Sequence, residues 1–583
     1  MQEYANVWPQ NGLFAFSGVD GETCHAEPFV ASGLRESIGW RFWVKPKVVL
    51  QAKVGETDIV ARRSEEGFCF TDCWQFDVAA GEACGVVRGA FLDRCAIAIS
   101  LDMPGFDPEH GAELVPDQPG KEIDNALLYE CEGCWLAVYS SPPTAERRYG
   151  IAISYNTAEE AVDGARQASE ADLDQAILAR LAFYQEAPIP EALADNLRRA
   201  YYKALSVHKV NIESAQLDVP CRWTTPDRMP HRHMWLWDTA FHSIGLQHVR
   251  RDLGEDALYA LFAKQRDDGK LLLASQPGQP PREESNTQPP IVAWAVYRQF
   301  SNTNRTEFIE KLYPQLVRYL EWFEANRKDE RGLYGWEIRA TDDPIRSARG
   351  GESGMDNSPR FDKVESMTAI DLAGYMAAEY LALAKLAEAL GKADDETQWR
   401  ERQQAIAQKV NELLWDDEDR LYYDLDEDGE FIRIKTSAAF MALHGKIADR
   451  DRAEALRAHM MNPREFWTGL PVASVAMDEP TFSKDMWRGP TWVNVNVLIY
   501  HALRDYGFVE EAYSLARKSL DAIAAWYARY GCLYEYYDAT GETAPFALPR
   551  KGAPGEAGGV GFGVVEDLQW TAASFVHLAN EIH

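Results

Sequence analysis

The spacing of apolar residues changes near residue 160. Before that point, short segments alternate between apolar and polar residues or run apolar, and clusters of Gly, Pro and Asp separate them. Examples are RFWVKPKVVLQAKV at 41–54, RCAIAISLDM at 94–103 and RRYGIAISYNT at 147–157. Many short strands with turns between them and no intervening helices predict an antiparallel β-sandwich over residues 1–160. We find no catalytic constellation in this region and expect it to have a structural or substrate-framing role.

After that region the apolar positions follow a helical period. A helical linker is predicted over 161–189, because helical spacing there stops at Pro188 and Pro190. Further along, Leu372, Met376 and Leu383 recur at helical steps, and Gly391 ends that helix. The helices that we predict cover residues 190–212, 236–250, 253–265, 289–301, 305–328, 367–390, 394–415, 435–445, 449–460, 491–506, 508–527 and 565–581.

Twelve helices in roughly 390 residues fit six helical hairpins, which predicts a catalytic (α/α)6 barrel over residues 190–583. Long loops follow alternate helices and are rich in Trp, Gly, Asp and Glu. Loops on a rigid scaffold commonly carry the chemistry of an enzyme, so we expect the active site there. These loops are predicted at 266–288, 329–366, 461–490 and 528–564.

The composition narrows the range of partners. The chain has 583 residues, with 60 Lys and Arg against 91 Asp and Glu, for a net charge of −31. This balance argues against a nucleic acid or an anionic membrane as partner. Eighteen Trp and 25 Tyr suit a protein that stacks against flat polar ligands, so a small carbohydrate is the expected partner. The oligomeric state stays open.

The cellular location of the protein and the redox state of its cysteines are predicted together. No run of about 18 apolar residues and no secretory signal is recognised, so we expect a cytoplasmic protein with reduced thiols. The cysteines Cys131 and Cys134 could join Cys69 and Cys73 in a zinc site. However, they flank a turn inside sequence typical of strands, which favours buried free thiols. The histidines at 231, 233 and 242 lack a metal-binding spacing, so no metal is assigned to them.

The loop segment GGESGMDNSPRFD at 350–362 is the strongest candidate for chemistry. A carboxylic acid that donates a proton at neutral pH needs a walled pocket, and this Gly- and Pro-bearing loop can aim Asp356 into one. Glu352 and Arg360 are expected to hold Asp356 in place. The alternative is a loop whose acidic residues only cap turns.

A second carboxylate lies in GCLYEYYDATG at 531–541. Glu535 stands between Tyr534 and Tyr536, where it could activate a water molecule beside a stacked sugar ring. The alternative is a β-hairpin with a cross-strand pair.

Aromatic clusters occur at three further places. A single tryptophan more often belongs to a core than to a ligand platform, but their recurrence on the same side of the helical hairpins favours a platform. The residues in question are Trp235, Trp237 and Asp238 at the second helix, Trp487, Arg488 and Trp492 before the tenth, and Trp570 at the twelfth.

Six motifs occur in the order seen in glycoside hydrolase family 63, and over residues 195–582 the sequence resembles that family. They are MWLWDTAFH (234–242), NTQPPIVAW (286–294), ESGMDNSPRFD (352–362), DMWRGPTWVNVN (485–496), LYEYYDATGE (533–542) and DLQWTAASF (567–575). The family contains processing α-glucosidases and bacterial mannosylglycerate and glucosylglycerate hydrolases. The trehalases share the barrel and an ESGWD-type motif, but their glycine-rich and QWD signatures are missing here.

The resemblance implies roles for individual residues. The general acid would be Asp356 and the general base Glu535, and Glu352 would tune Asp356. Phe361 stands where the family commonly has tryptophan, which leaves the substrate open. Sugar contacts are implied for Trp235, Trp237, Asp238, Gln288, Trp487, Arg488, Trp492 and Trp570, and we add Tyr536 beside Glu535.

These observations together predict an inverting, exo-acting α-glycosidase that acts on a glucoside or a mannoside. Inversion needs room for a water molecule, so the two carboxyl groups should lie roughly 6.5–9.5 Å apart. No cofactor is expected, because an acid, a base and water suffice. Two alternatives are a sugar isomerase or epimerase on the same barrel, which would rely on pocket histidines, and a non-catalytic carbohydrate-binding protein.

Overall fold

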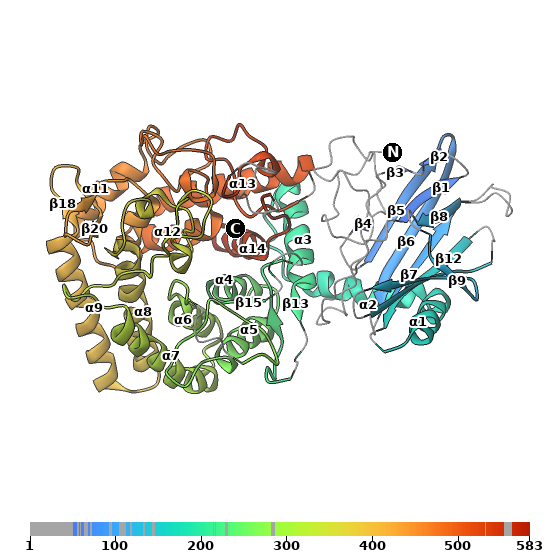
Figure 1. Cartoon of the computed structure of the whole chain (residues 1–583), viewed down its shortest axis with the longest axis horizontal. Helices are drawn as coiled ribbons and strands as arrows, with labels where there is room; N and C mark the ends of the chain where they lie inside the picture. The colour runs from blue at the N-terminus through green and yellow to red at the C-terminus, as the bar shows by residue number, and fades with distance from the viewer. Residues whose placement is uncertain are drawn as a thin grey trace.

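A computed structural model describes most of the chain. It has a β-sheet region at one end and a larger helical region at the other (Figure 1). The described residues are 50–583, apart from 55–56, 59, 63–67, 70–72, 93–95, 104–111, 117–118, 132–133, 143–145, 155, 214, 216, 228–230, 232, 281–285, 531 and 553–562.

Two antiparallel sheets form the β region within the described residues, which confirms the predicted antiparallel β domain. The smaller sheet has the order β2-β1-β8, with β1 (Leu50–Val54), β2 (Thr57–Asp58) and β8 (Ala112–Pro116). The larger sheet has the order β3-β5-β6-β7-β12-β11-β10-β9, and β4 pairs with β5. Its strands are β3 (Val60–Arg62), β4 (Phe68–Cys69), β5 (Cys73–Ala80), β6 (Ala83–Leu92), β7 (Ala96–Asp102), β9 (Lys121–Ile123), β10 (Ala126–Cys131), β11 (Cys134–Ser140) and β12 (Glu146–Ser154).

The predicted linker 161–189 corresponds to two helices that pack on the larger sheet. Helix α1 (Ala158–Glu170) begins after Thr157, whose side chain accepts a hydrogen bond from the Glu160 backbone N–H. It comes so close to β12 that a Cβ added at Gly150 would lie 1.8 Å from the Ala165 carbonyl oxygen. Helix α2 (Leu173–Glu186) contacts β5, β6 and β7. The domain boundaries that we drew at 160 and 190 stay a prediction.

The cysteine hypothesis is tested only in part. Cys131 and Cys134 face each other in the β10–β11 register, so they do flank a turn between two strands. Cys73 is fully buried. The side chains of Cys69, Cys131 and Cys134 lie outside the described side chains, and the zinc alternative stays untested.

The helical region is the predicted barrel, and each predicted helix has a counterpart within the described residues. The inner helices contact one another in the closed order α4-α6-α8-α10-α12-α14 and back to α4. These are α4 (Leu236–Leu246), α6 (Val292–Thr303), α8 (Ile370–Ala389), α10 (Met441–His444), α12 (Val493–Asp505) and α14 (Gln569–Ile582). The helices between them in the chain pack outside this ring: α3 (Asp195–Val210), α5 (Arg251–Ala263), α7 (Thr306–Asn326), α9 (Ala393–Leu413), α11 (Arg450–Met460) and α13 (Val509–Tyr530).

The sequence explains which helices lie inside. Every residue of α4 is buried, as a helix surrounded by other helices requires. In contrast, α9 buries only Trp399, Gln403, Ile406 and Val410, which follow one another at steps of four, three and four residues. That spacing gives one apolar stripe and leaves the rest of α9 to water.

Short elements connect the helices. Two-stranded or three-stranded pairings and single turns of 3-10 helix occur mainly in the long loops. They are β13 (Ile212–Glu213), β14 (Trp223–Thr224), β15 (Met234–Trp235), β16 (Ala274–Ser275), β17 (Met367–Thr368), β18 (Trp415–Asp416), β19 (Leu421–Tyr422), β20 (Asp424–Asp426), β21 (Phe431–Ile432), η1 (Gly351–Ser353), η2 (Pro359–Phe361), η3 (Ser437–Phe440), η4 (Met486–Arg488) and η5 (Pro545–Ala547).

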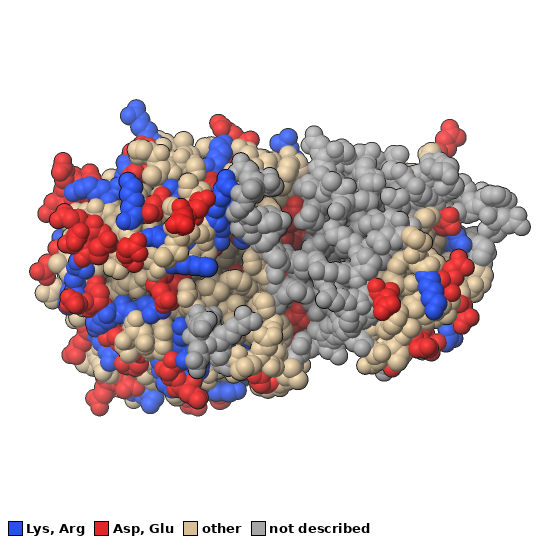
Figure 2. Space-filling view, viewed as in Figure 1, with Lys and Arg blue, Asp and Glu red and all other residues tan. Residues whose placement is uncertain are grey.

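The surface agrees with the strongly acidic composition. Asp and Glu side chains are spread over the visible face of the helical region, with Lys and Arg among them (Figure 2). None of the helices in the described part of the chain is both long enough and apolar enough to cross a membrane.

Candidate active site

A cavity of about 340 Å³ opens at the N-terminal ends of the inner helices. Its lining comes from the starts of α4, α12 and α14, from the segment before α6, and from the loops before α8 and α14. Most of the predicted site residues meet there. Those that line the cavity are Trp235, Trp237, Asp238, Gln288, Asp356, Trp487, Trp492, Glu535 and Trp570.

Three predicted site residues lie outside this lining. The buried Glu352 carboxylate accepts hydrogen bonds from Arg327, at 2.7 and 2.8 Å, and from the Glu337 backbone N–H. Arg488 forms an ion pair with Asp362 at 2.7 Å. The Tyr536 hydroxyl donates to the Pro549 carbonyl at 2.6 Å. These side chains support the walls of the cavity from behind.

Arg360 does not hold Asp356, contrary to the sequence-based expectation. Its guanidinium is fully buried and pairs with Asp371 and Asp424. A buried cation needs carboxylate partners of its own, and these two lie at the start of α8 and on β20. Arg360 therefore ties the acid-bearing loop to the barrel and leaves Asp356 to a different cation.

Tryptophan rings form the apolar wall of the cavity. Trp487 and Trp492 stack with ring centroids 3.8 Å apart and an angle of 4° between their planes. Trp237 packs edge-on against Trp570 at 5.7 Å. Trp237 also lies directly against Gly354, where an added Cβ would come within 2.6 Å of the indole. Gly354 has a φ of 74°, so both its conformation and the close approach favour glycine.

Asp356 lies in the loop between α7 and α8. Its carbonyl accepts a hydrogen bond from the Gly350 backbone N–H at 2.9 Å, which closes the loop on itself. The carboxylate lines the cavity, and its Oδ2 lies 2.5 Å from the Nζ of Lys551. The side chain is 23% exposed, so the acid candidate is open to a ligand.

Glu535 is held more tightly. Arg550 donates from Nε to Oε2 at 3.0 Å and from an Nη to Oε1 at 3.1 Å. The Val565 backbone N–H also points to Oε2, at 3.3 Å. Trp570 donates its indole N–H to the Glu535 carbonyl at 3.1 Å. Oε2 thus has two donors and Oε1 has one, which leaves Oε1 as the oxygen with room for a water molecule.

One turn, residues 549–552, supplies both cations. Asp485 accepts the backbone N–H groups of Lys551 and Gly552, each at 2.8 Å. The sequence motifs did not indicate a role for Arg550, Lys551 or Asp485. For the two cations, the available signal is their adjacency beside the Gly-rich segment 552–563, most of which lies outside the described residues.

Two more titratable groups line the cavity. Burial, reinforced by the charges of Asp227 and Glu535, holds the pKa of Asp238 well above its usual range. The shift favours the protonated carboxyl, a form that can donate a hydrogen bond as well as accept one. His231 pairs with Asp227 at 2.6 Å and packs edge-on against Trp235. Thus a histidine does reach the pocket, although the loops of Asp356 and Glu535 contain none.

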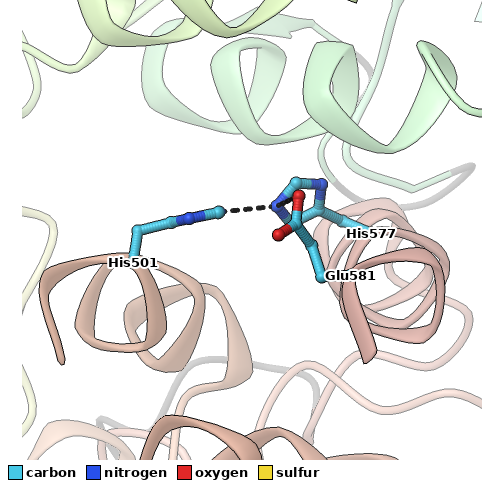
Figure 3. A group of neighbouring side chains, drawn as sticks. All are labelled: His501, His577 and Glu581. Carbon is cyan, nitrogen blue, oxygen red and sulfur yellow. Dashed lines mark hydrogen bonds and ion pairs between the residues drawn. The ribbon is translucent and has the colours of Figure 1, made fainter. Parts of the chain in front are cut away.

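A separate group of side chains has a composition that could hold a metal. His501, His577 and Glu581 offer ligand atoms within 4.8 Å of one another, near the C-terminal ends of α12 and α14 (Figure 3). However, Arg298 contacts Nδ1 of His501, and a guanidinium can only donate. The proton of His501 is then on Nε2, which lies 2.7 Å from Nε2 of His577. A metal ion would have to displace that proton.

The comparisons with known proteins identify the family of the chain. The family described as mannosylglycerate hydrolase MGH1-like glycoside hydrolase domain matches residues 231–553. The mannosylglycerate hydrolase of Rubrobacter radiotolerans is 27% identical over 406 residues, covering 54% of this chain and 88% of the relative. The structure of the GH63 mannosylglycerate hydrolase from Thermus thermophilus in complex with glucose is 25% identical, with a TM-score of 0.51, over 65% of this chain and 99% of that one.

A bacterial glucoamylase complexed with acarbose extends the likeness of fold. It covers 100% of this chain and 95% of its own, with a TM-score of 0.60 at 11% identity. The β region followed by the helical barrel is thus a known arrangement. The family match covers more than half of the chain and includes Asp356, Glu535 and Arg550. The chain belongs to the MGH1-like glycoside hydrolase family, and the resemblance to glycoside hydrolase family 63 is confirmed.

Proposed function

We propose that this protein is an inverting, exo-acting α-glycosidase with Asp356 as general acid and Glu535 as general base. The observation that carries the proposal is that both carboxylates line one cavity, although they stand 535 − 356 = 179 residues apart in the chain. An inverting glycosidase needs one carboxyl on each side of the scissile bond. The tryptophan walls give a sugar ring apolar surface to pack on and exclude bulk water.

In the proposed reaction, Asp356 gives its proton to the glycosidic oxygen as the bond to the anomeric carbon breaks. Glu535 takes a proton from a water molecule that attacks that carbon from the opposite face. The donors on Oε2 favour Oε1 as the atom that receives this proton. We expect roughly 6.5–9.5 Å between the two carboxyl groups, as room for the water requires.

The buried carboxyl of Asp238 adds specificity. Burial raises its pKa and so favours the protonated form, which can donate a hydrogen bond to a sugar hydroxyl without burying a charge. The two relatives compared above, from Rubrobacter radiotolerans and Thermus thermophilus, are mannosylglycerate hydrolases, and the structure of the second is in complex with glucose. We therefore propose a mannoside or glucoside substrate, with mannosylglycerate as the first compound to test.

The test is proton NMR during digestion of a panel of α-glucosides and α-mannosides. Wild-type enzyme should release the β-anomer first, and Asp356→Asn and Glu535→Gln should each lower kcat by about 10³-fold. Asp342→Asn, an exposed carboxylate of the loop that carries Asp356, is the matched control and should behave as wild type. Release of the α-anomer first would overturn inversion. Conversion without release of an aglycone would favour an isomerase, and binding without turnover a carbohydrate-binding protein.

A further inference from the structure

Lys551 occupies one of the two carboxyl oxygens of the proposed general acid. Its Nζ lies 2.5 Å from Oδ2 of Asp356, and both side chains line the cavity. In this contact the ammonium is the donor and Oδ2 the acceptor, so Oδ2 carries no proton there. A glycosidic oxygen that is to receive a proton from Oδ2 needs the same position. The ion pair and the acid role therefore exclude each other at that atom.

The backbone that carries Lys551 is held firmly. Lys551 has a φ of 55° and Gly552 a φ of 103°. A non-glycine residue in this region is strained, and such strain persists only where surrounding contacts enforce it. Asp485 supplies those contacts through its two bonds to backbone N–H groups, and Tyr536 anchors the preceding Pro549. The turn thus fixes where the lysine side chain starts and leaves its flexible stem to move.

The neighbouring cations are engaged elsewhere. Arg550 makes two bonds to Glu535, so moving it would release the general base. Arg488 makes two bonds to Asp362, at 2.9 and 2.7 Å, and lies outside the cavity lining. Of these three described cations, Arg550 and Lys551 line the cavity, and only Lys551 can leave its partner without disturbing the base.

We propose that Lys551 is a specificity-determining residue, which exchanges Asp356 for an anionic group on the leaving part of the substrate. Opening a partly buried ion pair is costly when the ammonium is left without an anion, and cheap when a carboxylate or phosphate replaces the lost one. Glycosides with an anionic leaving group therefore gain access to Asp356 more readily than neutral ones. This inference rests on the proposed function and adds the residue that reads the charge of the leaving group.

The test compares substrates that differ in one group. The compounds share the glycone that the wild type cleaves and carry glycerate, glycerol phosphate or uncharged glycerol as leaving group. Wild type should prefer the anionic compounds by about tenfold or more in kcat/KM. In Lys551→Met, kcat/KM for them should fall about tenfold and that for the glycerol compound should rise several-fold. The glycerate and glycerol phosphate arms identify which anion fits.

Two further variants keep the result interpretable. Lys551→Arg retains the charge and should retain the preference, which a merely structural role of the lysine would not predict. Lys363→Met removes an exposed lysine from the loop that carries Asp356 and should leave the preference for anionic substrates as in wild type. If Lys551→Met does not fold, Lys551→Gln takes its place in the comparison.

Two results would overturn the inference: an unchanged preference in the folded Lys551 variant, or an equal change for charged and uncharged substrates. The proposed function fails by a different observation, namely full activity of Asp356→Asn. An inactive Asp356→Asn together with an unchanged preference in Lys551→Met would remove the role of Lys551 alone.

Discussion

The two ends of the inner helix ring both contain buried titratable groups, but they treat these groups differently. At the N-terminal ends, Asp238, Asp356 and Glu535 face a cavity. Toward the C-terminal ends, His248, His501 and His577 bond to one another, with 3.0 Å between His248 Nε2 and His577 Nδ1. Burial and shifted pKa values occur at both ends, so these features alone do not mark a catalytic site. The cavity makes the difference.

The direction of the inner helices explains why carboxylates lie at their N-terminal ends and Arg298 lies toward their C-terminal ends. The N-terminal end of a helix carries a partial positive charge and the C-terminal end a partial negative one. Carboxylates fit the first environment, and Glu379 accepts the Ala293 and Trp294 backbone N–H groups at the start of α6, each at 2.8 Å. The cation Arg298 fits the second, beside the histidines. Helix direction thus fits the carboxylates at one end and Arg298 at the other, although each end also holds groups of the opposite kind, such as Glu581 beside His577 and Lys551 beside Asp356.

The largest expected effect on activity comes from removing Arg550, the cation that binds Glu535. Arg550→Met should lower kcat by about 10²- to 10³-fold, because the base loses the two bonds that orient it. It should also lower the free energy of unfolding by about 3 kcal/mol, since Glu535 stays buried without a cation to balance its charge. Steady-state kinetics and denaturant unfolding measure the two changes. Arg339→Met, at an exposed arginine, is the control, and a kcat within about threefold of wild type in Arg550→Met would contradict the role.

A smaller effect, on the pH dependence of stability, is expected from Glu379, which binds the N-terminal end of α6. Burial raises its pKa to about 7, against an ordinary value of 4.5. The folded protein therefore holds a proton that the unfolded chain releases, and the contribution of Glu379 to stability is lost as the pH rises through 7. Between about pH 7.5 and 5.5 the wild type should gain roughly 2 kcal/mol over Glu379→Gln. Urea unfolding at both values measures this, and a constant difference would refute it.

The opposite dependence of stability on pH is expected from His577, toward the C-terminal ends of the inner helices. Burial holds the pKa of His577 well below 6.5, so the unfolded chain takes up a proton that the folded protein refuses. The contribution of His577 to stability is complete above about pH 6.5 and is lost as the pH falls below it. From about pH 6.5 to 5.5, wild type should lose roughly 1 kcal/mol relative to His577→Leu. The same unfolding experiment tests it. If the stability difference between wild type and variant changed with pH in the same direction for His577→Leu and for Glu379→Gln, the contrast between the two ends would be wrong.

The sequence was sufficient to predict the barrel, because helical period is a local property. The single apolar stripe of α9 can be read from spacing alone. In α4 the apolar residues are interrupted by Asp238 and His242, although every residue of that helix is buried. The family motifs also identified all five tryptophans that line the cavity.

Partners of the charged side chains could not be predicted in the same way. Arg360, Arg488 and Lys551 are all cations near the candidate acid, and nothing in their spacing says which one reaches it. The answer depends on how loops separated by up to 195 residues, as from 356 to 551, meet in space. His231 was missed as a pocket residue for the same reason, since its loop approaches the carboxylates only in the folded barrel.

The closure of the ring has a consequence for how the protein is made. Helix α14 lies between α4 and α12, and Lys203 of α3 forms a buried ion pair with Asp567 just before α14, at 2.7 Å. The first and last helices of the barrel are therefore neighbours. A ribosome delivers the chain from its N-terminus, so the ring keeps an open apolar seam until α14 emerges. During that interval Trp237 lacks the Trp570 ring that later covers it, and the nascent barrel exposes apolar surface that is prone to aggregation.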